Sequence, residues 1–145
     1  MNEQQSSDGE GADGGIRTVG DMLELQRAFI ENLPEAKVVV DEAGRIVMVN
    51  RMTELMFGYT RDQMIGQPVE MLVPERLRER HVKHRADYSE APYTRPMGAN
   101  LTLVARQKSG REIPVIILLA PLVISSGSYT IAEIRRRDDI GVSVK

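Results

Sequence analysis

The chain has 145 residues, of which 41% are hydrophobic and 28% are charged, a composition that indicates one globular domain. The net charge of −2 gives no overall attraction to nucleic acid or to an anionic membrane, and no apolar run approaches the length of about 20 residues that spans a bilayer. The absence of cysteine excludes disulfides, thiol nucleophiles and cysteine-based zinc sites, and it fits the reducing cytoplasm, where we expect the protein to act.

The beginning of the chain changes character at about residue 17. Residues 1–16 are rich in Gly, Ser, Asp and Glu and bury too little apolar surface to offset chain entropy, so we expect a disordered tail. Residues 17–34 predict an amphipathic helix for dimerisation or signalling, which Pro34 ends. Its apolar residues recur at spacings of three, four and seven: Val19, Met22, Leu23, Phe29, Ile30 and Leu33.

Two β-prone runs and a helical segment come next. Residues 36–40 and 45–50 predict strands, and the Asp-Glu-Ala-Gly sequence at 41–44 predicts the hairpin turn between them. The following segment predicts short helices at 53–57, 61–65 and 68–72 and a longer basic helix at about 75–89.

Alternating patterning then returns in the last third of the chain. It predicts three strands, at 100–107, 112–122 and 128–136, joined by Gly-containing turns. Strands joined by short turns pair antiparallel, so the expected fold is α+β, a five-stranded antiparallel sheet with helices on one face. We place the domain core at residues 35–137 and a tail or linker start at 138–145.

The strand at 112–122 is apolar on both of its faces, whereas a half-exposed strand alternates with polar residues. Both faces of the sheet must therefore be covered. The helices of residues 51–90 are expected to cover one face, and the helix at 17–34 or a second copy of the chain is expected to cover the other. This predicts a homodimer whose interface contains Met22, Leu23, Phe29, Ile30, Ile116 and Leu118.

Five short motifs in this order carry a resemblance to a known family. They are Val49-Asn50, the Glu-Leu-Met-Phe-Gly-Tyr sequence at 54–59, Ile-Gly-Gln-Pro-Val at 65–69, Val-Pro-Glu at 73–75 and Lys-Ser-Gly-Arg-Glu-Ile-Pro-Val at 108–115. With the order of the elements, they closely resemble the PAS sensor domain family over roughly residues 18–137.

The resemblance implies a signalling module without catalytic activity. PAS domains bind a small ligand or cofactor between the helices and the inner sheet face, or bind nothing and mediate dimerisation. They pass the change through flanking helices to an output domain, such as the histidine kinase of a two-component system. The alternative is therefore a ligand-free interaction domain.

The basic helix contains the only two histidines, His81 and His84. Helical spacing predicts that they share the apolar face with Leu77 and Tyr88, and that Arg85 lies on the opposite, solvated face with the other basic residues. The expected ligand pocket consists of His81, His84, Leu101, Leu103 and Ile117.

The resemblance also bears on the cofactor. In the similar oxygen-sensing haem PAS kinases, the axial histidine follows an Arg on this helix, and His81 matches that position. Leu101 stands where those sensors carry an oxygen-contacting arginine. Flavin photochemistry that needs a cysteine adduct is excluded. A histidine bonded to backbone or water is the competing interpretation, and a two-histidine metal site lacks an evident carboxylate or third ligand.

The sequence favours neither nucleic-acid binding nor catalysis. The Lys and Arg residues of the basic helix are offset by neighbouring Glu and Asp, which indicates a solvated face rather than a nucleic-acid site. No phosphate-binding glycine loop, spaced catalytic triad or paired carboxylates are apparent, so we expect no enzyme activity.

Overall fold

The computed structural model describes residue 15, residues 17–97 and residues 103–137. The chain divides into two compact units, residues 1–30 and 31–145, which are described separately. The expected tails at 1–16 and 138–145 fall almost entirely outside the described residues. In the part of the chain that is described, no helix combines the length and the apolar content that a membrane crossing requires.

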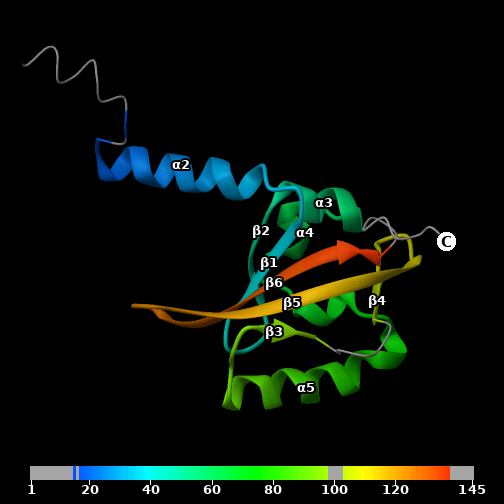
Figure 1. Ribbon diagram of the computed structural model, residues 1–145. Helices are drawn as coiled ribbons and strands as arrows, with labels where there is room; N and C mark the ends of the chain where they lie inside the picture. Colours follow the sequence, from blue (N-terminus) through cyan, green and yellow to red (C-terminus); the bar gives the residue numbers. More distant parts are fainter. Residues whose placement is uncertain (1–14, 16, 98–102, 138–145) are drawn as a thin grey trace, which may run out of the picture. The chain divides into compact units, whose positions relative to one another are not determined.

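The first unit is described mainly by helix α2 (Val19–Glu31) (Figure 1). Its start is stabilised by a reciprocal cap: the Asp21 backbone N–H donates to Thr18 Oγ1 at 2.9 Å, and the Thr18 N–H donates to Asp21 Oδ2 at 3.2 Å. None of the α2 residues is buried. Phe29, for example, is 63% exposed. The apolar stripe predicted from the sequence is therefore an uncovered surface.

The second unit is built on one antiparallel sheet. Its strands are β1 (Ala36–Val40), β2 (Ile46–Val49), β3 (Arg95–Pro96), β4 (Leu103–Arg106), β5 (Glu112–Ile124) and β6 (Gly127–Arg136). The strand order is β2-β1-β6-β5-β3, and β4 also pairs with β5. The sheet therefore has six strands: the five that the sequence predicts and the short additional strand β3. The sequence did not predict β3, because a two-residue strand that ends in Pro96 shows no alternation.

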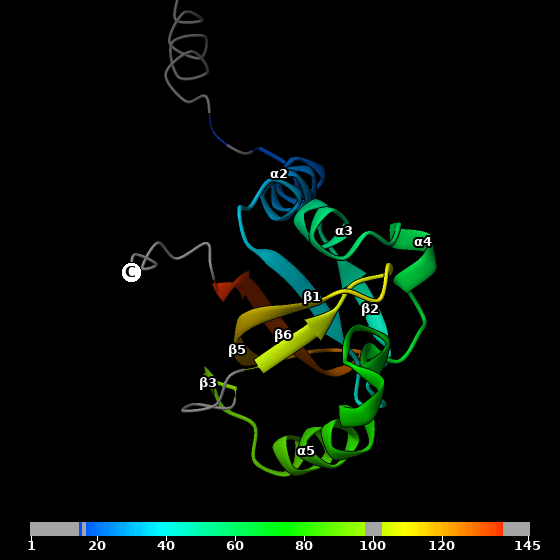
Figure 2. The same ribbon diagram turned by 90° about the vertical axis from the view of Figure 1, so that its right-hand side faces the viewer.

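Short helices connect β2 to β3. They are α3 (Arg51–Phe57), α4 (Arg61–Met64), the 3-10 helices η1 (Val69–Leu72) and η2 (Glu75–Leu77), and α5 (Arg78–Glu90). The long basic helix expected at 75–89 therefore begins with a separate 3-10 turn. Figure 2 shows α3, α4 and α5 on the same side of the sheet.

Buried polar groups stabilise the junction between β2 and α3. Asn50 is fully buried and caps α3. Its Oδ1 accepts hydrogen bonds from the Lys37 backbone N–H at 2.9 Å and the Thr53 N–H at 3.2 Å, and its Nδ2 donates to the Glu35 carbonyl at 3.0 Å. One side chain thus joins the start of β1, the end of β2 and the first turn of α3.

The core lies between the helices and the inner face of the sheet. It contains residues that alternate along β1 and β5, further strand residues from β2, β4 and β6, and helix residues such as Phe57, Met64 and Leu72. Phe57 and Met64 are fully buried. The opposite, outer row of β5 stays accessible: Ile116 is 36% exposed and Leu118 is 41% exposed. The doubly apolar pattern of β5 therefore corresponds to one covered face and one accessible face.

Candidate functional site

The inward face of α5 is formed by residues spaced three or four apart. Tyr88 is buried, and Leu77, His81 and Arg85 are half-buried, whereas His84 is exposed. The prediction that the two histidines share the inward face is therefore wrong for His84. The stripe that packs inward runs through positions 77, 81, 85 and 88, and position 84 is turned away from it.

A buried carboxylate from η1 meets this face. The Oε2 atom of Glu70 lies 2.6 Å from His81 Nδ1, and it accepts a hydrogen bond from Arg85 Nε at 3.0 Å. Arg85 Nη2 also donates to Glu70 Oε1 at 3.3 Å. We call Glu70, His81 and Arg85 the α5 charge cluster. It connects α5 to η1 through three contacts at one carboxylate.

The charge of Glu70 is maintained by its partners. Burial by itself raises the pKa of the Glu70 carboxyl, but the hydrogen bonds from Arg85 and His81 outweigh it, and the net pKa lies below its ordinary value. Glu70 is therefore ionised at neutral pH, and a buried charge of this kind requires the cation that Arg85 supplies.

The sequence did not reveal this cluster. Arg85 was expected on the solvated face, and its ion pair with Glu70 shows that this placement was wrong. The sequence showed no carboxylate near the histidines, because Glu70 precedes His81 by eleven residues. The Glu70 signal in the sequence was weak, because a four-residue 3-10 helix shows too few positions for an amphipathic pattern.

The turn between β1 and β2 makes room for Arg85. Gly44 has a φ of +82°, and a Cβ atom added to it would lie 2.2 Å from Arg85 Cζ. Only glycine therefore leaves both the left-handed conformation and the space that the guanidinium occupies. The Gly44 carbonyl also accepts a hydrogen bond from the Val69 N–H at 2.9 Å, next to Glu70 in η1.

Of the other predicted pocket residues, two pack against the core and one lies outside the described residues. Leu103 and Ile117 are half-buried and pack against the core. Leu101 lies outside the described residues. Across residues 17–97 and 103–137, no group of three or more His, Cys, Asp and Glu side chains is arranged to hold a metal ion.

Two tyrosines, Tyr88 and Tyr93, connect the inward side of α5 to β3. The guanidinium carbon of Arg95 lies 4.9 Å from the ring centroids of both Tyr88 and Tyr93. The Tyr88 hydroxyl donates to the Tyr93 carbonyl at 3.0 Å, so the buried ring has a partner for its polar end. These contacts attach the end of α5 to the first residue of β3.

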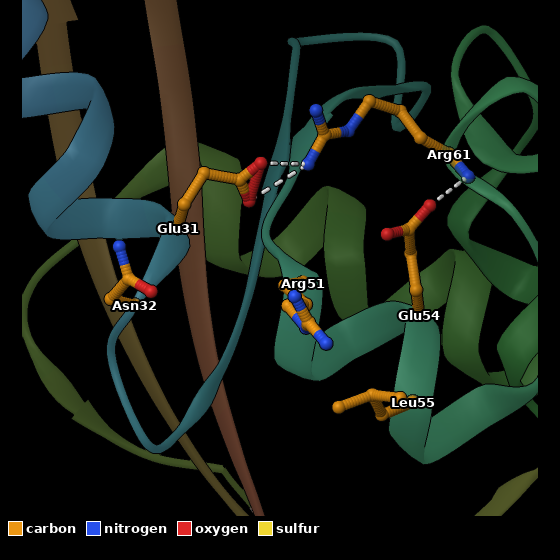
Figure 3. Close-up of a pocket in the computed structure, with 6 residues that line it drawn as sticks. All are labelled: Glu31, Asn32, Arg51, Glu54, Leu55 and Arg61. Atoms are coloured by element: carbon orange, nitrogen blue, oxygen red, sulfur yellow. Dashed lines mark hydrogen bonds and ion pairs between the residues drawn. The ribbon is translucent and has the colours of Figure 1, made fainter.

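An open groove of about 560 Å³ lies beside α3 (Figure 3). It is lined by Glu31, Asn32, Arg51, Glu54, Leu55 and Arg61. Arg61 Nη2 donates to Glu31 Oε1 at 2.8 Å, and the Arg61 backbone N–H donates to Glu54 Oε2 at 2.6 Å. The hydrogen bond from Arg61 to Glu31 raises the pKa of the Arg61 guanidinium above its ordinary value. The groove is polar and its charges are largely paired, so it does not resemble an apolar ligand pocket.

The predicted interface residues are accessible in both units. Met22, Leu23 and Phe29 are exposed on α2, and Ile30 is half-buried. On the sheet, Ile116 and Leu118 are exposed and oppose Arg135 and Glu133 of β6. Farther along, β5 and β6 carry more exposed apolar side chains, including Val123 and Ile124. Each unit therefore presents an apolar surface of its own.

Comparison with known proteins establishes the family. The family model for the PAS fold matches residues 24–135, so the chain belongs to the PAS family. The PAS domain of an HTR-like protein from Haloarcula marismortui has a similar structure, with a TM-score of 0.70 and 17% identity over 81% of this chain and 93% of that one. The PAS domain of a two-component sensor histidine kinase gives a TM-score of 0.69 at 17% identity, over 83% of this chain and all of that one.

Two curated relatives are sensors. The sensor protein FixL of Bradyrhizobium diazoefficiens is 24% identical over 109 residues, which are 75% of this chain and 22% of that protein. The oxygen sensor protein DosP of Escherichia coli is 26% identical over 98 residues, which are 68% of this chain and 12% of that protein. The chain thus spans less than a quarter of either relative and is homologous to a part of each.

Proposed function

We propose that the protein is a cytoplasmic sensory PAS module that forms a homodimer and relays the binding of a ligand or partner to an output domain. The uncovered apolar surfaces of the two units support the dimer: α2 has no buried residue, and the outer row of β5 is exposed. A helix of 13 residues is marginally stable alone in water, so α2 needs an apolar partner.

The output domain is expected to belong to the kind of proteins in which similar PAS domains occur. One structural neighbour comes from a two-component sensor histidine kinase, which favours a histidine kinase or a comparable signalling effector. The proposed mechanism is a shift in population between two dimer arrangements, which the ligand biases by binding one of them more tightly. No catalytic step is proposed for this chain.

The mass of the full chain in solution tests the dimer. We expect sedimentation equilibrium to give twice the 16.2 kDa chain mass at micromolar concentrations. A monomer over the whole concentration range would contradict the proposal, and so would a dimer that persists unchanged when residues 1–33 are deleted and Leu118 is replaced by Asp.

A ligand-free interaction domain is the first alternative. It is favoured by Leu103 and Ile117, which pack against the core and thus fill part of the space where a PAS ligand would bind. This alternative predicts that small molecules do not raise the melting temperature of the chain. A ligand that binds the folded state would raise it in proportion to its concentration.

A haem-based gas or redox sensor is the second alternative, and the arrangement of His81 favours it. A metal-bound imidazole usually presents one nitrogen to the metal and donates its other N–H to a carboxylate. Glu70 contacts Nδ1, and within the described residues Nε2 has no hydrogen-bond partner, so the residues fit an axial ligand. Haem iron would supply the binding of the gas, while this chain would hold the iron through His81. The resemblance to the oxygen sensor DosP supports the same alternative.

The visible spectrum of the purified protein with one equivalent of haemin tests this alternative. A sharp, stoichiometric Soret band would support it. Broad, non-saturating absorbance would contradict it and leave a colourless ligand or the interaction-only domain.

A further inference from the structure

The α5 charge cluster determines which imidazole nitrogen of His81 carries the proton. An ionised carboxylate accepts hydrogen bonds and has no proton to donate. Glu70 is ionised because its partners lower its pKa, and its Oε2 lies 2.6 Å from His81 Nδ1. The nitrogen that faces Glu70 must therefore be the donor, which places a proton on Nδ1.

We propose that Glu70 and Arg85 are positioning residues that place a proton on Nδ1 of His81 and leave Nε2 as the nitrogen that offers an electron pair to a ligand. The chemical class of the ligand follows from that electron pair: the bound group is a hydrogen-bond donor or a metal-centred cofactor. The inference rests on the proposed ligand-sensing function and specifies the atom that makes the contact.

Arg85 has a separate part in this arrangement. A buried carboxylate requires a compensating positive charge. Arg85 donates to both carboxylate oxygens, at 3.0 and 3.3 Å, and supplies the compensating positive charge. Glu70 therefore does not depend on His81 for its compensating charge, and the ring needs only to donate from Nδ1.

The surrounding contacts also restrict the orientation of the His81 ring. Glu70 is buried in η1, and Arg85 lies one helical turn after His81 on the same face of α5. Gly44 leaves space for the guanidinium on its other side. The carboxylate is thus held from two directions, and the imidazole that contacts it is held in turn.

Nitrogen NMR of the imidazole rings tests the inference directly. Long-range proton–nitrogen correlation on ¹⁵N-labelled full chain, at about pH 7.5 and so about one unit above the ordinary histidine pKa, identifies the protonated nitrogen of each ring. The chain has only two histidines, so a His84→Gln variant assigns the spectrum. We expect His81 to be protonated on Nδ1, and exposed His84 to show the mixed tautomers of a free imidazole. Protonation of His81 on Nε2 would overturn the inference.

Two variants separate positioning from simple packing. Glu70→Leu should move the His81 spectrum toward that of His84, because the ring loses its acceptor at Nδ1. Arg85→Gln, which leaves the Glu70 acceptor in place, should keep the proton on Nδ1. Glu79→Gln, an exposed change on α5, should leave both rings unaltered. An unchanged His81 spectrum in folded Glu70→Leu would contradict the assignment.

The wild-type spectrum decides the tautomer even where a variant fails to fold. The measurement needs neither ligand nor dimer, so its outcome is independent of the tests of the proposed function. A monomeric protein with the expected tautomer would refute the dimer alone, and a dimer with the opposite tautomer would refute the positioning alone.

Discussion

The guanidinium of Arg85 lies directly against the backbone of Gly44, at a distance that leaves no room for a Cβ atom. This contact joins α5 to the turn between β1 and β2, and the same guanidinium binds Glu70 of η1. Three segments that are distant in the sequence therefore meet at one side chain. The contact links a turn residue to a helix about 40 residues later in the chain.

Gly44→Ala should destabilise the protein through two effects. The left-handed φ costs a residue with a Cβ about 1–2 kcal/mol, and the added Cβ also displaces the Arg85 guanidinium from its place beside Glu70. Gly66→Ala is the matched control, because Gly66 has a similar φ of +86° with nothing within 4 Å of the added Cβ. Chemical denaturation should give a larger loss of unfolding free energy for Gly44→Ala, and equal losses would refute the contact.

Asn50→Ala should cost about 2–3 kcal/mol of unfolding free energy, because it leaves several buried backbone groups without partners. Thr60→Ala is the comparison. Thr60 caps α4 at an exposed site with a capping box, and its loss should cost only about 1 kcal/mol. Urea unfolding of both variants checks the difference, and similar costs would mean that Asn50 contributes only as a helix cap.

Acid should destabilise the protein partly through Glu70. Its pKa in the folded protein is lowered, so ionised Glu70 contributes stability above the ordinary value of about 4.3, and this contribution is lost as the pH falls through the lowered pKa. The unfolding free energy of the wild type should fall more steeply over this range than that of Glu70→Gln. Parallel pH profiles would show that the pKa of Glu70 is the same in both states.

Charged substitutions should weaken the dimer. Leu118→Asp on the outer row of β5 and Phe29→Asp on α2 each place a charge in the proposed interface, and each should raise the dimer dissociation constant at least tenfold, about 1.4 kcal/mol. Leu55→Asp is the control, because Leu55 is also exposed but lies on α3, on the helical side of the sheet. Analytical ultracentrifugation measures all three constants, and equal effects would place the interface elsewhere.

His81→Ala should abolish a stoichiometric haemin Soret band if haem binds, while His84→Ala should keep it. The structure provides the physical reason, because His81 faces inward beside Glu70 and His84 is exposed. Loss of the band in both variants would indicate non-specific binding through surface histidines. Retention in both would exclude His81 as the axial ligand.

Much of the fold was predictable from local patterns. β-prone runs and alternation located β1, β2, β5 and β6 to within about two residues, because residues of each strand pack in the core. The short helix predicted at 53–57 ends at Gly58 in the left-handed conformation, which glycine adopts readily at helix ends. These features depend on neighbouring residues along the chain, and the sequence contains that information directly. The motifs built on them were sufficient to predict the PAS family.

Only the tertiary structure decided the composition of the candidate site. Helical spacing shows which residues of α5 share a stripe, but it does not show which stripe packs inward, and the predicted positions of His84 and Arg85 were wrong for that reason. Glu70, which contacts the inward-facing His81 and Arg85, lies in a separate short helix. It precedes these two residues by eleven and fifteen positions in the sequence. The free energy of burying a charge depends on partners that are distant in the sequence, so no local sequence pattern predicts it.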